Sequence, residues 1–566
     1  MRRLHELIRR IAVTIGRAAT AATLLAAMPA GIASAQGMAG APASPVRDCR
    51  AGPEIDIPVI ARGFDLIAIH ATDDLVGPSI FDRQAEMPDG TALDIGVAPM
   101  DGYADSLDAY LACETPFLRT THALMSEIAA RTETDPRTEM IPVFFYGWSN
   151  GDRVLLGRNV DALSNLAGSE LAAAPQDLGF ALQMIEDAGD GAGVVVTPDP
   201  GGALAAPAGA RFAVVSSEAA RILTAGDVGT GAEGSVAGAR ALVSTTSASR
   251  VAGDILAVRR DFWEDNPDTV RTVIRALLKA EELFREDLKK QVVDFMRASE
   301  ILHGGDPSRE AALRRMWSGV ESVGLAGQVD WADPDNARSF TRLINETQSR
   351  MVAAGLLDSA AGFATPPLDY AALGGDVWDK RRVETTAFDS DAASRAIREM
   401  SSAELDGNTI AQVTILFKPN QAVFPVAEYR EAFEEALDKS QVYAGAVLSI
   451  EAHSSYLAYV DGVNRRGWTL PRQKRELASL RNTSTARALS VRDALLETAD
   501  TLGLPLDPSQ ITIQGRGIED PLGGFCGELP CRPKSEAEWK ESRRVVFRVV
   551  QMESEAAVFT PLNDWN

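Results

Sequence analysis

A serine flanked by glycines is the first feature of this 566-residue chain that could perform covalent chemistry. Residues 147–151 read Gly-Trp-Ser-Asn-Gly and fit the G-x-S-x-G turn that exposes a nucleophilic serine, here Ser149, after a strand. That turn requires a helix immediately afterwards, whereas residues 152–156 predict another strand. It also requires a downstream histidine paired with an acid, and His303 is the one histidine that follows Ser149 in this module. We therefore expect no enzyme, and keep a serine hydrolase that uses Ser149 as an alternative.

The other patterns typical of cofactor or metal sites are weaker. Residues 229–234, Gly-Thr-Gly-Ala-Glu-Gly, fit the dinucleotide-binding fingerprint, but they follow a helix-like segment, so we interpret them as a flexible loop. The histidines are scattered, and no Cys/His spacing typical of a metal site occurs. No cofactor and no metal site are expected.

The middle of the chain, residues 55–385, alternates short apolar strands with helical patterns, which indicates an α/β module. One clear helix begins at Asn266-Pro267, because asparagine caps a helix and proline suits its first position. Another spans about 337–355. The predicted strands are residues 65–70, 93–101, 141–146, 153–156, 193–196, 213–215, 240–245 and 254–258.

Several strings of this module, in order, resemble the periplasmic solute-binding proteins of the nitrate, taurine and thiamine-precursor type. They are LDIGVAP (93–99), WSNGDRVLLG (148–157), RFAVVSSEAARIL (211–223) and the long segment 239–280. The resemblance covers about 300 residues and implies two α/β lobes that flank a cleft, with the chain crossing between them twice.

In such sheets a ligand lies beyond the carboxyl ends of the strands. Hydroxyl, amide and backbone donors suit a small polar or anionic solute, whereas Asp101, Asp152 and Glu218 could instead neutralise an amine. Asp101 and Asn150 are also ordinary turn residues, and Glu218 could form an ion pair at a hinge. The resemblance places these residues in the cleft: Met100, Asp101, Gly102, Tyr103, Ser149, Asn150, Gly151, Asp152, Glu218, Thr245 and Thr246.

The last third of the chain predicts a separate α+β domain. Strands are expected at 413–417, 446–451, 511–517 and 542–549, and helices at 427–437 and from 485 onward. The RA-x-x-V helix, the G-x-G-x-x-x-P turn and the final RRV strand resemble the OmpA-like domain that binds the peptide stem of peptidoglycan. The chain is thus expected to be a two-lobed periplasmic binding protein fold followed by an α+β OmpA-like domain.

That resemblance implies an arginine for the carboxylate of diaminopimelate and an anion for its ammonium group. Arg487 matches the family's arginine, but Ser455 occupies the position of the family's aspartate. An inserted segment separates the two residues, and Asp461 within it could supply the anion. Both peptidoglycan binding and a retained fold with altered affinity remain open.

The same resemblance implies how the cysteines pair. Four cysteines in an oxidising compartment allow three pairings. OmpA-like domains often carry a disulfide in the loop before the last strand, where Cys526 and Cys531 lie. Cys49 would then pair with Cys113.

The first residues predict export. Arginines precede the apolar run 18–30, and Ala33-Ser34-Ala35 offers a cleavage site. Loss of the five arginines and one glutamate of residues 1–35 changes the net charge from −23 to about −27, which disfavours nucleic acid as a partner. The expected parts are a signal peptide (1–35), a linker (36–54), the two-lobed domain (55–385), a connector (386–410), the OmpA-like domain (411–552) and a tail (553–566).

Together these features predict a periplasmic protein whose lobes close on a small solute while the C-terminal domain binds peptidoglycan. An inner-membrane ABC permease or an envelope complex is the expected partner, for uptake or for sensing. A structural protein with an empty cleft is the rival interpretation.

Overall fold

The computed structural model describes residues 46–550 with interruptions, and residues 559–561. The longest interruptions are 287–297, 375–385, 389–396 and 398–404. The predicted signal peptide, most of the connector and most of the tail lie outside the described residues. Among the described helices, none is long and apolar enough to cross a membrane.

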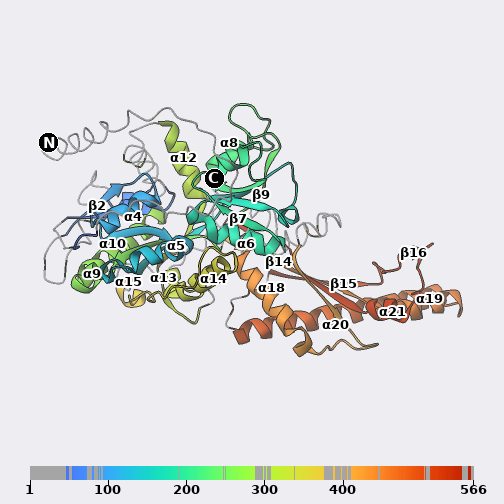
Figure 1. The fold of residues 1–566 in the computed structure, drawn as a ribbon. Coiled ribbons are helices and arrows are strands. Elements are labelled where there is room, and N and C mark those ends of the chain that lie inside the picture. The colour runs from blue at the N-terminus through green and yellow to red at the C-terminus, as the bar shows by residue number, and fades with distance from the viewer. Residues whose placement is uncertain are drawn as a thin grey trace. The chain divides into compact units, whose positions relative to one another are not determined.

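The first lobe is built on a buried antiparallel sheet with the strand order β11-β4-β10-β3 (Figure 1). Strands β4 and β10 are buried along their whole length, which explains the apolar runs 141–146 and 255–258. The strands are β3 (Phe117–Thr121), β4 (Met140–Ser149), β10 (Gly253–Arg259) and β11 (Val320–Ser322), with the parallel pair β1 (Glu54–Val59) and β2 (Asp94–Pro99) in the same lobe.

Helices form the rest of this lobe. The long helix α10 packs against α2, α9, α13 and α15, and its Val270, Ile274 and Leu277 lie in the same hydrophobic core as the sheet. The helices are α2 (Asp65–Ala71), α4 (Tyr103–Leu111), α5 (His122–Thr132), α9 (Arg260–Asp265), α10 (Pro267–Glu286), α12 (Pro307–Ser318), α13 (Gly324–Ala332), α14 (Phe340–Ala353) and α15 (Tyr370–Gly374).

Residues 65–70 form helix α2, so the strand expected there was wrong. Every residue of α2 is buried, and a short, wholly buried apolar run has no polar face from which helix and strand can be told apart. Asp65 fixes the start of the helix, because its carboxylate accepts hydrogen bonds from the backbone N–H groups of Ile60 (2.8 Å) and Arg62 (2.7 Å).

The second lobe is a mixed sheet with the order β7-β6-β8-β5-β9 (Figure 1). Leu155, Phe180 and Phe212 are fully buried in its core. The elements are β5 (Arg153–Arg158), β6 (Glu170–Ala173), α6 (Leu178–Ala188), β7 (Gly193–Val196), α7 (Pro200–Ala205), β8 (Phe212–Ser216), α8 (Ser217–Leu223) and β9 (Ala239–Ser244).

The chain passes from the first lobe to the second between β4 and β5, and returns between β9 and β10. The crossing segments are residues 150–152 and 245–252. The two-lobed α/β fold predicted for this part of the chain is confirmed.

The C-terminal domain is a sheet with the order β13-β18-β14-β15, in which β14 and β15 are parallel and the other neighbours antiparallel. The predicted α+β domain is confirmed. Helix α20 begins at Leu470 and not near Thr485, because the inserted segment extends it toward its N-terminus. The elements are β13 (Thr409–Leu416), α18 (Arg430–Val442), β14 (Val447–His453), α19 (Leu457–Asn464), α20 (Leu470–Leu502), β15 (Ile511–Gly517), β16 (Phe525–Cys526), β17 (Leu529–Pro530), α21 (Glu536–Glu541) and β18 (Arg544–Val550).

Both expected disulfides are present. Cys49–Cys113 joins the first described residues to the end of α4, with Cα atoms 5.3 Å apart. Cys526–Cys531 closes the small β16–β17 hairpin, with Cα atoms 4.8 Å apart.

Candidate functional site

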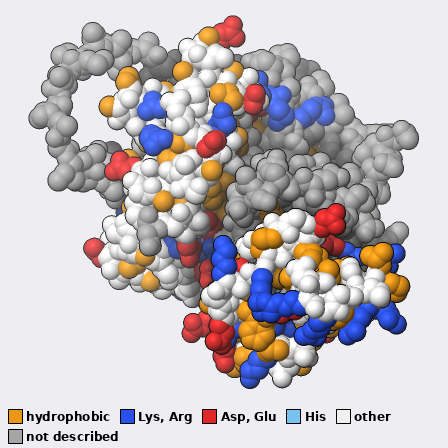
Figure 2. All heavy atoms as spheres, turned by 90° about the vertical axis from the view of Figure 1, so that its right-hand side faces the viewer, with side chains coloured by type: hydrophobic (Ala, Val, Ile, Leu, Met, Phe, Trp, Pro, Cys, Tyr) orange, Lys and Arg blue, Asp and Glu red, His pale blue; other side chains and the backbone are white. Residues whose placement is uncertain are grey.

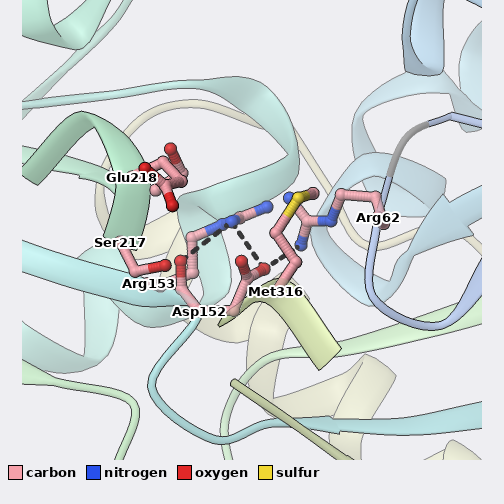
Figure 3. A pocket seen from close by; sticks show the side chains of 7 residues that line it. Arg62, Asp152, Arg153, Ser217, Glu218 and Met316 are labelled. Carbon is pink, nitrogen blue, oxygen red and sulfur yellow. Dashed lines mark hydrogen bonds and ion pairs between the residues drawn. The ribbon is translucent and has the colours of Figure 1, made fainter. Parts of the chain in front are cut away.

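A polar pocket of about 190 Å³ lies where the two lobes meet (Figure 3). Arg62 reaches it from the loop between β1 and α2 of the first lobe. Asp152 is the last residue of the first crossing segment, and Arg153 begins β5 of the second lobe. Ser217 and Glu218 come from the first turn of α8, opposite Arg62 in Figure 3. The lining residues are Arg62, Asp152, Arg153, Ser216, Ser217, Glu218 and Met316.

Buried ion pairs connect this pocket to both lobes. The Arg62 guanidinium lies 2.9 Å from the Asp152 carboxylate and 3.7 Å from that of Asp254. In the first lobe the series continues through Arg119, which lies 2.7 Å from Asp254 and 3.3 Å from Asp65. In the second lobe Arg153 pairs with Asp152 (2.7 Å) and with Asp177. We call this series the charge chain; it runs Asp65, Arg119, Asp254, Arg62, Asp152, Arg153, Asp177.

The charge chain alternates in sign and has a carboxylate at both ends. These described residues therefore supply four carboxylates against three guanidinium groups. Because the site is buried, the excess negative charge is costly. Burial, together with the nearby carboxylates of Asp254 and Asp177, raises the pKa of Asp152 to about 6, although Arg62 opposes this rise.

Aromatic side chains hold the guanidinium groups in place on the first-lobe side. The Tyr103 hydroxyl donates to the Asp254 carboxylate (3.1 Å), and Arg62 lies over the Tyr103 ring. Arg119 lies 4.0 Å from the centre of the Tyr146 ring. The Nε atom of Arg62 is buried and has no hydrogen-bond partner among the described residues. Arg62 thus retains a donor that a ligand could use.

Some of the residues predicted to line the cleft join the two crossing segments instead. The Thr245 hydroxyl oxygen lies 2.7 Å from that of Ser149 and accepts hydrogen bonds from the backbone N–H groups of Gly151 (3.0 Å) and Arg153 (3.1 Å). Gly151 has a φ of +100°, and a Cβ there would lie 2.8 Å from the Thr246 hydroxyl. These residues form the hinge between the lobes.

Among the other predicted residues, Asp152 and Glu218 line the pocket, and Glu218 also pairs with Arg315 and Arg221. Tyr103 contacts the charge chain. Met100, Asp101 and Gly102 lie in the turn before α4, where Asp101 is exposed, and the N–H of Asn150 donates to the Gly319 carbonyl.

Sequence reasoning missed Arg62, Arg153, Ser216, Ser217 and Met316. Arg62 lies three residues after the end of β1, a strand that was not predicted. If β1 had been recognised as a strand, Arg62 would have been expected just beyond its carboxyl end, where ligands of such sheets bind.

The surroundings of Ser149 differ from those of a nucleophile elbow. Ser149 is the last residue of β4, and the next regular element is strand β5, not a helix. Its hydroxyl group contacts Thr245 and contacts no histidine among the described residues. His303 lies outside those residues.

In the C-terminal domain, Arg487 is 1% exposed and is surrounded by backbone oxygens. Its guanidinium donates to the carbonyls of Gln421 (2.9 Å) and His453 (2.9 Å) and lies over the Phe417 ring. No described carboxylate forms an ion pair with it. Burial, together with the nearby Arg543, lowers the pKa of Arg487 to about 10.

The other residues predicted to bind the wall have their own partners. The Ser455 hydroxyl accepts a hydrogen bond from the Trp539 indole N–H (3.1 Å). Asp461 lies in α19 and pairs with Arg465 (3.7 Å) and Arg532 (3.5 Å). No ion pair between Asp461 and Arg487 occurs among the described residues.

The hinge gives a testable prediction. Thr245→Val removes an acceptor shared by two N–H groups, so we expect the free energy of unfolding of the lobes to fall by about 2–4 kcal/mol. Urea denaturation followed by tryptophan fluorescence measures this change. Thr245→Ser keeps the hydroxyl and should cost far less. Equal losses for Thr245→Val and Thr245→Ser would mean that packing, not the hydrogen bonds, stabilises the hinge.

A second prediction concerns pH. Because the native pKa of Asp152 lies above that of an unfolded aspartate, the native state binds a proton more strongly than the unfolded chain. The contribution of Asp152 to stability therefore falls as pH rises through about 6. Asp152→Asn removes this term, so its Tm relative to wild type should be lower at about pH 5 than at about pH 7. The exposed Asp161→Asn variant is the control; a pH-independent difference for Asp152→Asn would contradict the prediction.

The chain is similar in structure to solved periplasmic binding proteins. The alkanesulfonate-binding protein SsuA from Xanthomonas axonopodis pv. citri, bound to MOPS, is 12% identical over 55% of this chain and 96% of that chain, with a TM-score of 0.38. The periplasmic aliphatic sulphonate binding protein SsuA from Escherichia coli is 11% identical over 59% of this chain and 94% of that chain, also with a TM-score of 0.38.

A further solved structure is similar to the C-terminal part. The OmpA-like domain of FopA1 from Francisella tularensis subsp. tularensis is 18% identical over 27% of this chain and 75% of that chain, with a TM-score of 0.18. No protein-family model and no curated protein sequence matches the chain.

Proposed function

We propose that this protein binds a small polar solute in the periplasm by closing its two lobes around the pocket, and that it is not an enzyme. One observation carries the proposal: Arg62 of the first lobe and Asp152, at the point where the chain enters the second lobe, line the same pocket and pair with each other. Separation of the lobes would leave both charges without this partner. A ligand that satisfies them both would favour the closed form.

The charges of the pocket favour a solute that carries a positive group. The charge chain has one carboxylate more than guanidinium groups. Glu218 also lies at the pocket wall, where Arg315 and Arg221 pair with it. A purely anionic solute would increase this excess, whereas an amine or a quaternary ammonium group would neutralise it. The free Nε–H of Arg62 could bind an acceptor on the same molecule. We therefore expect a cationic or zwitterionic solute.

The C-terminal domain supports a proposal of attachment to the cell wall. Arg487 is a buried cation whose hydrogen-bond partners among the described residues are carbonyl oxygens, so a carboxylate of a stem peptide would supply the missing negative charge. A protein held at the wall suits sensing for an envelope complex. Delivery of solute to an ABC permease is the second use, and it requires the permease to lie within reach of the attached protein.

The solute proposal predicts a thermal shift. The full chain would be heated with a panel of cationic, zwitterionic, anionic and neutral solutes. A solute with a positive group should raise the Tm of the wild type, because it binds only the native state. Glu218→Gln should weaken that affinity about tenfold or more, since it removes a charged hydrogen-bond partner without a change of shape.

Glu264→Gln on α9, an exposed position outside the pocket, is the matched control and should respond like wild type. Stabilisation by anions alone would contradict the proposed solute class. The absence of any shift would favour the structural interpretation with an empty cleft.

The wall proposal predicts sedimentation of the full chain with purified peptidoglycan sacculi. Arg487→Ala should reduce the bound fraction sharply, because the arginine–carboxylate contact forms only in the complex. Ser455→Asp should strengthen binding, since it restores the anion at the position of the family's aspartate.

Arg492→Ala, on the same helix, is the control, because Arg492 is partly exposed and pairs with Asp493. Thermal melting of Arg487→Ala separates loss of binding from loss of folding. If neither the wild type nor Ser455→Asp sediments, the attachment proposal is wrong.

A further inference from the structure

The segment inserted in the C-terminal domain concentrates positive charge on an acidic protein. Residues 457–482 cover α19, the turn after it and the first part of α20. They contain six arginine or lysine residues and two acidic ones, whereas the whole chain has a net charge of −23. All six basic side chains are exposed: Arg465, Arg466, Arg472, Lys474, Arg475 and Arg481. We call this region the basic surface.

Most of these cations are not neutralised within the molecule. Arg465 pairs with Asp461, and Arg481 pairs with Glu519. Among the described residues, no carboxylate forms an ion pair with Arg466, Lys474 or Arg475. A surface of this kind attracts an external anion.

Large apolar side chains lie among the cations. Leu470 is 71% exposed, and Leu477 is also exposed. With 100° per residue, Leu470, Lys474, Leu477 and Arg481 fall on one narrow face of α20. This face alternates apolar and basic side chains.

The disulfide-closed hairpin extends the same surface. Arg532, which follows β17, pairs with Asp461 of α19 at 3.5 Å and so holds the hairpin beside the inserted segment. Phe525 at the hairpin is 55% exposed, and Leu522 before it is exposed too. Figure 2 shows lysine and arginine side chains interspersed with hydrophobic ones at its lower right.

The turn that connects α19 to α20 is well packed. The Trp468 ring lies against Gly462, where a Cβ would come within 2.4 Å of the ring, and Arg472 lies 4.5 Å from the ring centre. Gln473 donates to the Trp468 carbonyl at 2.7 Å. These contacts fix how the first turns of α20 leave α19.

We propose that the basic surface docks on a membrane surface rich in anionic phospholipids. Cations next to exposed leucine and phenylalanine side chains suit the boundary between charged headgroups and acyl chains. Wall carboxylates would engage the cations and leave the leucines in water. Because the rest of the chain is acidic, an anionic membrane would repel it and orient this end of the C-terminal domain toward the lipid.

Co-sedimentation of the full chain with lipid vesicles tests the proposal. Vesicles of phosphatidylcholine alone would be compared with vesicles that also contain phosphatidylglycerol, at low and at high salt. We expect binding to the anionic vesicles only, and loss of binding at high salt. The combined change Arg466→Glu, Lys474→Glu and Arg475→Glu should lower the partition coefficient about a hundredfold or more.

A matched control places the same charge change elsewhere: Arg211→Glu, Arg240→Glu and Arg271→Glu alter exposed residues of the lobes and should bind close to wild type. Leu470→Ser with Leu477→Ser should lower the partition coefficient about tenfold. Equal binding by wild type and the triple reversal would overturn the proposal, as would failure of the wild type to bind anionic vesicles. If the reversal instead abolishes sedimentation with sacculi while wild type ignores vesicles, the basic surface faces the wall and the membrane assignment is wrong.

Discussion

The ion pair between Arg62 and Asp152 is the interaction on which the arrangement of the site depends. It joins Arg62 of the first lobe to the residue through which the chain enters the second lobe, in surroundings that exclude most water, where an unpaired charge is costly. The hinge around Thr245 keeps the crossing segments together but contributes no charge to the pocket. In the proposed closure, the ion pair of Arg62 would stabilise the closed form, whereas the hydrogen bonds of Thr245 stabilise the connection between the lobes. Mutation can change these two interactions separately.

The sequence predicted the elements better than the site. Most predicted strands were found because their apolar runs are bounded by turns. Asp152 and Glu218 were predicted as site residues because the segments that contain them, 148–157 and 211–223, resemble those of solute-binding proteins. Arg62 could not be found in this way, since its partners Asp152 and Asp254 lie far from it in the chain and meet it only after folding. Ser149 and Thr245 carry hydroxyl groups of the kind that bind ligands, but in the folded protein these two hydroxyl groups contact each other.

In the C-terminal domain, the first turns of helix α20 are exposed, whereas its later turns have a buried face. The buried face of α20 begins at Ser484 and includes Arg487, whereas the preceding turns expose their basic side chains. At 33 residues the helix is roughly 50 Å long. Its first part lies in the insertion that distinguishes this chain from the OmpA-like pattern. The insertion thus adds an exposed surface to the domain, and the buried part of α20 that contains Arg487 still packs against the sheet.

The odd number of charges in the charge chain links occupancy of the pocket to protons. With a carboxylate at each end, the series can be neutralised either by one proton or by one positive group of a ligand. Entry of a cation near pH 6 would therefore expel a proton into the solvent. The apparent enthalpy of association would then depend on the ionisation enthalpy of the buffer. Under the proposed function, binding of a cationic solute would release a proton, and a lower pH would weaken that binding.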